Sequence, residues 1–208
     1  MQVDMDEQTR SHVKKVLEAI AEEADTEARW LNTLSLLEYV GARKISKSVA
    51  STHPRFSEVL DHLADEARHA FAFKRLAEIV ANGRVDEYLA EDAARAYFSQ
   101  LDERATEWLS QVAPDAGTLE NYLLVTTLIE RRAMTVYPLY RGISSNDAVR
   151  EELQNIVVEE QDHRVELQEK CLELLAGHGV EGIEDAIAVE RELFEGLMDT
   201  IASEVGAQ

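Results

Sequence analysis

Apolar residues recur at intervals of three and four along almost the whole chain of 208 residues. This spacing places them on one face of an α-helix, and no segment shows the alternation that is typical of a β-strand. Only three prolines and nine glycines are present, which is few for a protein with many turns. The sequence therefore predicts an all-α protein. Because no linker is long enough to separate two folding units, it predicts a single domain over residues 1–208.

Turn signals divide the pattern into successive helices. One ends at Asn82-Gly83, and another ends before Pro114. The first helical range is either one long helix or two in line with a break near Asp25. Pro138 is expected to kink the fourth helix or end it. The expected ranges are about 8–50, 55–81, 86–112, 118–141, 147–176 and 183–204.

The formal net charge of −20, from 21 Lys and Arg against 41 Asp and Glu, excludes several kinds of partner. A chain this acidic is repelled by nucleic acid and by an anionic membrane surface. No apolar run approaches the length of about 18 residues that a membrane-spanning helix needs, and the first residues show no secretory signal. The single cysteine, Cys171, excludes an internal disulfide framework. We therefore expect a cytoplasmic protein with no nucleic-acid and no membrane partner.

Two of the expected helices contain the same short motif. The second carries DEARH over residues 65–69, and the fifth carries EEQDH over residues 159–163. In each motif a Glu and a His stand three residues apart, so both side chains project from one helical face. Both motifs lie within apolar stripes. A carboxylate and an imidazole that face a core need compensating partners, because bare burial of charge is costly.

A lone glutamate in strongly apolar surroundings precedes each motif. Glu38 comes 28 residues before Glu66, and Glu130 comes 30 residues before Glu160. In a hairpin of two antiparallel helices, this spacing brings two mid-helix residues to the same level along the helix axes. Four helices that carry E, ExxH, E and ExxH can therefore bring four carboxylates and two imidazoles together at one level of a bundle.

This ordered set resembles the ferritin-like superfamily of di-iron and di-manganese carboxylate proteins, over about residues 28–83 and 118–176. The resemblance implies a ferritin-like four-helix bundle with a helical crossover insertion and an additional C-terminal helix. It also implies that two Fe ions, an Fe/Mn pair or two Mn ions are bound, metals that suit carboxylate and imidazole ligands. The implied ligands are Glu38 and His69 on one ion, Glu130 and His163 on the other, and Glu66 and Glu160 bridging the two.

The first residue of each motif, just before the Glu of the Glu and His pair, is also acidic. Asp65 and Glu159 are well placed to accept the second ring N–H of the histidine in the opposite motif, which would orient the imidazole. The string DEARH is similar to that of di-iron oxygenases and related oxidases, where the Asp has this role. The alternative is that both acids simply face solvent.

Several neighbouring residues could form a channel or pocket beside the metals. His62 lies one turn before Glu66 and could line a channel, or it could be an ordinary packed or surface histidine. The small residues Gly41, Ala42 and Ala133 could leave room for a substrate or dioxygen, or they could let helices pack closely. Tyr137 could line the same pocket or relay electrons, although packing in the core is the simpler interpretation.

The favoured function is a non-haem dinuclear metal carboxylate oxidoreductase, an oxidase or oxygenase that activates dioxygen or peroxide with an external electron donor. The helix over 86–112 could cover its substrate pocket, and the chain could form a homodimer. One alternative is a ferroxidase and iron-storage protein of the ferritin or bacterioferritin type. Another is a rubrerythrin-like peroxidase, although no CxxC-bearing domain is present and Ala133 stands where rubrerythrins have a further Glu. The last is a helical interaction protein with a vestigial metal site.

Overall fold

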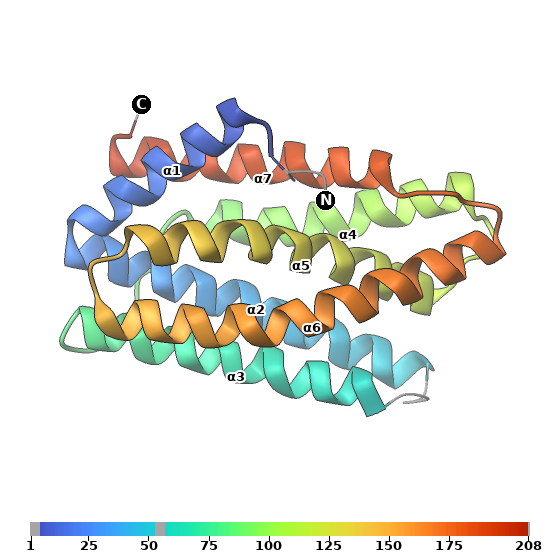
Figure 1. The fold of residues 1–208 in the computed structure, drawn as a ribbon, viewed down its shortest axis with the longest axis horizontal. Helices are drawn as coiled ribbons and strands as arrows, with labels where there is room; N and C mark the ends of the chain where they lie inside the picture. The colour runs from blue at the N-terminus through green and yellow to red at the C-terminus, as the bar shows by residue number, and fades with distance from the viewer. Residues whose placement is uncertain (1–4, 53–56, 208) are drawn as a thin grey trace.

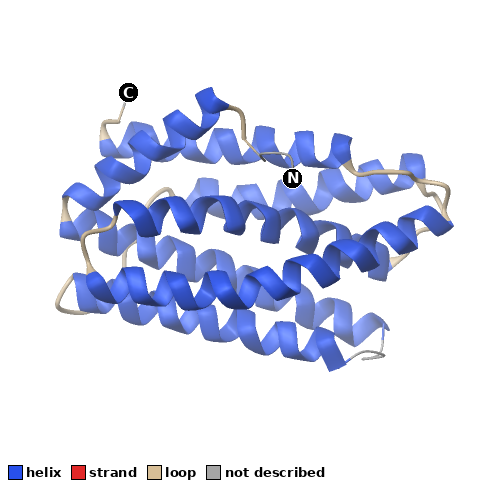
Figure 2. Cartoon of the chain, in the orientation of Figure 1, coloured by secondary structure: helices blue, strands red, loops and turns tan. Residues whose placement is uncertain are grey.

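The computed structural model describes residues 5–52 and 57–207, apart from the side chains of residues 49–52, 57–58 and 162–164. In this part of the chain every regular element is an α-helix, which confirms the all-α prediction (Figure 2). None of the described helices is long and apolar enough to cross a membrane. The seven helices found there are α1 (Glu7–Glu22), α2 (Ala24–Thr52), α3 (Ser57–Val80), α4 (Glu91–Val112), α5 (Thr118–Ile143), α6 (Asp147–Gly177) and α7 (Glu184–Val205).

Four of the helices form two antiparallel pairs, α2 with α3 and α5 with α6 (Figure 1). The two pairs pack against each other through contacts of α2 with α5 and of α3 with α6. These are the four helices on which the sequence places the E, ExxH, E and ExxH motifs. They lie side by side as one unit, so the motifs are near one another in space.

A second layer covers one side of this unit. Helix α4 contacts α2 and α5, while α7 packs on α4 and reaches α5, and α1 contacts α2, α5 and α7. Helices α2 and α5 therefore lie between two layers. In α5 this position leaves every residue from Tyr122 to Leu128 buried. A helix that is apolar on all sides is stable only in such a place.

The expected first helix, over about 8–50, needs a correction. The break is present, at Glu23, whose extended backbone (φ −126°, ψ 127°) separates α1 from α2. The two helices are not in line, however, because α1 turns back over the other helices (Figure 1). Its apolar face, with Val13, Leu17 and Ile20 buried, packs beside α5 and α7. This tertiary contact, rather than local sequence, sets the direction of α1.

Pro138 lies inside α5 and does not end it, contrary to one of the two expectations for this residue. The helix continues to Ile143, and the turns around the proline bury Val136, Tyr137 and Tyr140. Proline removes one backbone hydrogen bond from a helix. The burial of these side chains outweighs that cost. The helix expected over about 86–112 begins only at Glu91, because residues 86–90 are not helical. The other helices begin and end within about two residues of expectation, although the expected start of the second, at 55, lies outside the described residues.

Polar side chains of α2 hold the segment that leads into α4. The amide of Asn32 donates a hydrogen bond to the carbonyl of Glu87 at 2.7 Å. The hydroxyl of Thr33 accepts a hydrogen bond from the backbone N–H of Leu89 and donates one to its carbonyl, both at 2.8 Å. Thr33 and Leu89 are fully buried, so no solvent could replace these bonds. They fix where α4 begins.

Replacing Thr33 by Val is expected to lower the free energy of unfolding by about 2 kcal/mol, because both backbone groups of Leu89 lose their partner in a buried place. Urea denaturation measures the change. Thr135→Val is the matched control, since the Thr135 hydroxyl bonds only the carbonyl of Arg131 in its own helix. We expect its effect to stay within about 0.5 kcal/mol. Equal effects of the two variants would contradict the importance of the Thr33 contact.

Candidate metal centre

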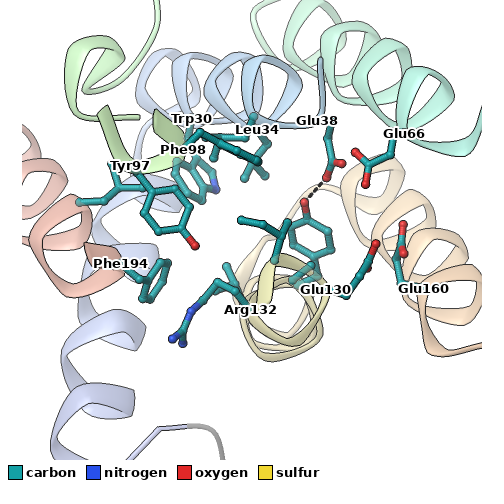
Figure 3. Close-up of a pocket in the computed structure, with 16 residues that line it drawn as sticks. Trp30, Leu34, Glu38, Glu66, Tyr97, Phe98, Glu130, Arg132, Glu160 and Phe194 are labelled. Carbon is teal, nitrogen blue, oxygen red and sulfur yellow. Dashed lines mark hydrogen bonds between the residues drawn. The ribbon is translucent and has the colours of Figure 1, made fainter. Parts of the chain in front are cut away.

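Four buried glutamates from four helices meet inside the helical unit. Glu38 comes from α2, Glu66 from α3, Glu130 from α5 and Glu160 from α6, and none is more than 9% exposed. All four line one end of the same cavity, where their carboxylates point toward one another (Figure 3). The convergence expected from the spacings of 28 and 30 residues is therefore present in the fold.

Burial and mutual repulsion make these carboxyl groups hard to ionise together. Burial raises the pKa of Glu38 well above its ordinary value, and the charges of Glu66 and Glu160 raise it further. The pKa of Glu130 is likewise raised well above its ordinary value, first by burial and then by the charge of Glu160. A cation bound among the four carboxylates would favour their ionised form.

His62 belongs to this cluster, although the sequence suggested either a channel residue or an ordinary packed or surface histidine. It is 3% exposed. Its Nε2 lies 3.2 Å from Oε1 of Glu66 and 3.0 Å from Oε1 of Glu130, while its Nδ1 lies 3.0 Å from the hydroxyl of Tyr122. The ligand atoms of His62, Glu66 and Glu130 all lie within 4.8 Å of one another, so this group could hold a metal ion.

The surroundings of His62 favour its charged form. Burial alone would lower the pKa of the imidazole, but the hydrogen bonds to Glu130 and Glu66 outweigh this effect and bring the pKa well above its ordinary value. The position four residues before Glu66, on the same face of α3, was the one sequence signal for this role. The contact with Glu130 comes from another helix and has no sequence signal.

His69 uses both ring nitrogens. Its Nδ1 faces Oε1 of Glu160 at 2.9 Å, and its Nε2 lies 2.9 Å from Oε2 of Glu159. Arg68 also donates to Glu159, at 2.7 Å. The structure thus places Glu159 against the second ring nitrogen of the opposite motif's histidine, as the sequence suggested. Burial would lower the pKa of His69, but the two carboxylates outweigh it and the pKa is raised.

The other half of this arrangement stays a prediction. Asp65 accepts a hydrogen bond from Arg68, one turn along its own helix. Its expected partner was His163 in the opposite motif. The backbone of His163 lies in α6, but its side chain is outside the described residues.

Tyr137 holds the carboxylate of Glu38. Its hydroxyl donates a hydrogen bond to Oε1 of Glu38, drawn as a dashed line in Figure 3. Burial raises the pKa of Tyr137 well above its ordinary value, and the charge of Glu38 adds to the effect, so the phenol keeps its proton. The ring packs against Phe73 with centroids 5.5 Å apart. Tyr137 is one of the residues that line the cavity.

The small residues near the ligands have different roles. Ala133 lines the cavity, whereas Gly41 and Ala42 are not among its lining residues. A Cβ atom at Gly41 would lie 2.7 Å from Oε2 of Glu66, closer than a side chain can approach. Gly41 therefore makes room for the carboxylate of Glu66 and not for a substrate. Ala42 is buried away from the cavity.

The cavity has a volume of about 60 Å³ and extends from the carboxylates to an apolar and aromatic end (Figure 3). Tyr97 and Phe98 of α4 lie at that end, so the expectation that the helix over 86–112 covers a pocket agrees with the structure. Phe194 and Leu197 of α7 complete the wall. The part played by α7 was missed, because periodicity does not say where a helix docks.

Comparison with protein-family models, with curated proteins and with solved structures finds no match to this chain. The class of protein is therefore set by the fold and the site alone. It is an all-helical protein with a buried Glu and His cluster that could bind metal. A small cavity opens on that cluster.

Gly41→Ala is expected to destabilise the protein by about 1–3 kcal/mol, because the new methyl group displaces the Glu66 carboxylate. Gly196→Ala in α7 is the matched control, since nothing lies within 4 Å of a Cβ atom there. In that exposed helical position alanine should stabilise by about 0.5–1 kcal/mol. Urea denaturation compares the two variants. An equal gain in both would show that Gly41 and Glu66 are not in close contact.

The metal-free protein is expected to lose stability as the pH rises from about 5.5 to about 8. Glu38 and Glu130 have raised pKa values in the folded protein. Above pH 4.5, their ordinary pKa, these two groups therefore bind more protons in the folded state than in the unfolded state. His62 and His69 also have raised pKa values, so the stability they contribute is present below 6.5 and is lost at higher pH. The lowered pKa of Glu159 acts below 4.5, outside this window.

Urea denaturation after treatment with a chelator measures this slope. The double variant Glu38→Gln and Glu130→Gln should show a shallower slope, because it removes two of the groups that take up protons on folding. A stability that rises with pH in the unmodified protein would contradict the assignment.

Proposed function

We propose that this protein is a dinuclear metal carboxylate protein of the ferritin-like kind. The four buried glutamates support the proposal, because two divalent cations would neutralise four carboxylates. The chemistry of the donor set fits as well. Carboxylate oxygens with a few imidazole nitrogens suit Fe and Mn better than metals that seek thiolates.

The ligands in this proposal come from all four helices. Glu38, Glu66, Glu130 and Glu160 supply oxygens, and His69 supplies Nδ1, which faces Glu160. His163 remains a ligand by resemblance alone. His62 is a further candidate that the resemblance does not supply, and its place between Glu66 and Glu130 supports it.

Within this class we propose an oxidoreductase that acts on dioxygen or peroxide with an external electron donor. Two Fe ions, two Mn ions or an Fe/Mn pair would supply the redox chemistry when bound. One observation carries this choice: the carboxylates line one end of a cavity whose other walls are largely apolar. Such walls exclude water from a reacting centre. An iron-storage protein needs no chamber of this kind, so it ranks second.

The chain's own residues would prepare the centre. Glu159 accepts from Nε2 of His69 and so holds the ring with Nδ1 toward Glu160. Tyr137 keeps a proton on its hydroxyl and gives it in a hydrogen bond to Glu38. Both contacts fix ligand groups before a metal binds, which lowers the cost of ordering them.

Metal analysis by mass spectrometry after anaerobic loading with Fe(II), and separately with Mn(II), tests the proposal. We expect about two ions per chain. Glu66→Gln should reduce this to below about one ion, because it removes a carboxylate shared by the site. Glu27→Gln is the matched control: Glu27 is also a buried glutamate of the core, but it accepts from Tyr140 and Ser144 outside the cluster. Its metal content should not change.

The same samples separate enzyme from storage. An enzyme should consume dioxygen on exposure of the Fe(II) form and retain about two ions. Uptake of many more iron ions by a large assembly, seen in size-exclusion chromatography, would favour storage. Fewer than about one ion per chain in the unmodified protein would overturn both versions of the proposal.

A further inference from the structure

The cavity beside the carboxylates contains a hydrogen-bond donor that the metal site does not use. Trp30 of α2 lines the cavity and is only 2% exposed. Its indole Nε1 is buried, and no described residue accepts a hydrogen bond from it. Buried N–H groups are nearly always paired, since an unpaired one pays the cost of leaving water. In Figure 3 the indole nitrogen lies on the side of the ring that faces the cavity.

The indole ring of Trp30 is held in this orientation by its packing. It meets the ring of Tyr140 edge to face, with centroids 6.4 Å apart and planes at 78°. Tyr140 is in turn fixed by the hydrogen bond from its hydroxyl to Glu27 at 3.0 Å. The donor is therefore positioned before any ligand arrives. Preorganisation of this kind reduces the entropy cost of binding.

The charge of Arg132, at the same end of the cavity, is matched by the carboxylate of Glu190. Arg132 donates to Glu190 through Nε at 2.8 Å and through Nη2 at 2.6 Å. Tyr97 donates to the same carboxylate at 2.7 Å, and the guanidinium stacks 4.1 Å above the centre of the Phe194 ring. This end of the cavity thus carries an ion pair with no net charge. At the opposite end the four glutamates repel anions when no metal is bound.

We propose that the cavity binds a small uncharged organic molecule with an oxygen acceptor, such as a ketone or an ether, and that Trp30 Nε1–H donates to that oxygen. The apolar part of the ligand packs on Leu34, Val136 and Leu197, between Trp30 and the carboxylates. A volume of about 60 Å³ has room for roughly four to six non-hydrogen atoms. The inference that this molecule is the substrate rests on the proposed function, whereas the binding site itself does not.

Equilibrium binding of cyclopentanone and of cyclopentane to the metal-loaded protein tests the proposal, with headspace gas chromatography as the readout. The two probes have nearly the same shape, and only the ketone has an acceptor. Trp30→Phe should weaken cyclopentanone by about 3–10-fold, the effect of one hydrogen bond, and leave cyclopentane within about twofold. Trp108→Phe is the matched control, because Trp108 also has a buried Nε1 with no acceptor among the described residues but does not line the cavity. It should change neither affinity.

A second variant tests the place of binding. Ala133→Leu fills the cavity from α5 and should weaken both probes by more than about tenfold. If Trp30→Phe does not fold, Ala133→Leu still tests whether the probes bind in this cavity. The proposal is overturned if neither probe binds, if Trp30→Phe weakens both probes equally, or if Ala133→Leu leaves both affinities unchanged.

Metal content, measured on the same samples, separates this proposal from the proposed function. If the protein binds cyclopentanone through Trp30 but holds no metal, the proposed cavity site stands and the proposed dinuclear centre is overturned. If the protein holds about two ions but binds neither probe, the dinuclear centre stands and the cavity site is overturned.

Discussion

Four carboxylates cannot share a buried site unless something offsets their charge, and the centre of this protein is built around that constraint. The chain meets it in part with its own groups. His62 lies between Glu66 and Glu130, and Tyr137 donates to Glu38. The charged form of His62 offsets part of the carboxylate charge, while burial and the neighbouring carboxylates still raise the pKa of Glu38 well above its ordinary value. A cation could offset the remaining carboxylate charge, and the group of His62, Glu66 and Glu130 could hold one.

The two-layer arrangement of helices serves the cluster and the cavity together. Helices α2 and α5 face the carboxylate cluster on one side and the α4/α7 layer on the other, so each supplies both a glutamate of the cluster and part of the cavity wall. The Arg132–Glu190 pair joins α5 to α7 two residues from Glu130. The electrostatic attraction within such a buried pair offsets only part of the free energy of desolvation. The pair therefore fixes the position of α7 without adding much stability.

Local periodicity was enough to predict the helices and the level at which the glutamates meet, because both depend on spacing along single helices and short hairpins. What it could not predict depends on contacts between distant segments. The turn of α1 at Glu23, the continuation of α5 through Pro138 and the docking of α7 are all set by packing. His62 shared a helical face with Glu66, but its second partner, Glu130, became visible only with α5 in place. For Gly41 the sequence left two interpretations open for a similar reason, because the group that fills its space comes from α3.

The cavity also has a direction, and α2 defines it. Trp30, Leu34 and Glu38 follow one another at intervals of four residues and line the cavity from its aromatic end to its carboxylate end. Two helical turns separate Trp30 from Glu38, about 12 Å along the axis. The indole ring and the glutamate side chain span part of that distance, and the remainder suits a molecule of a few atoms. An acceptor held at Trp30 would therefore leave the apolar end of the ligand beside the carboxylates. The cavity thus has the geometry to present a carbon atom, rather than the polar group, to whatever the carboxylates bind.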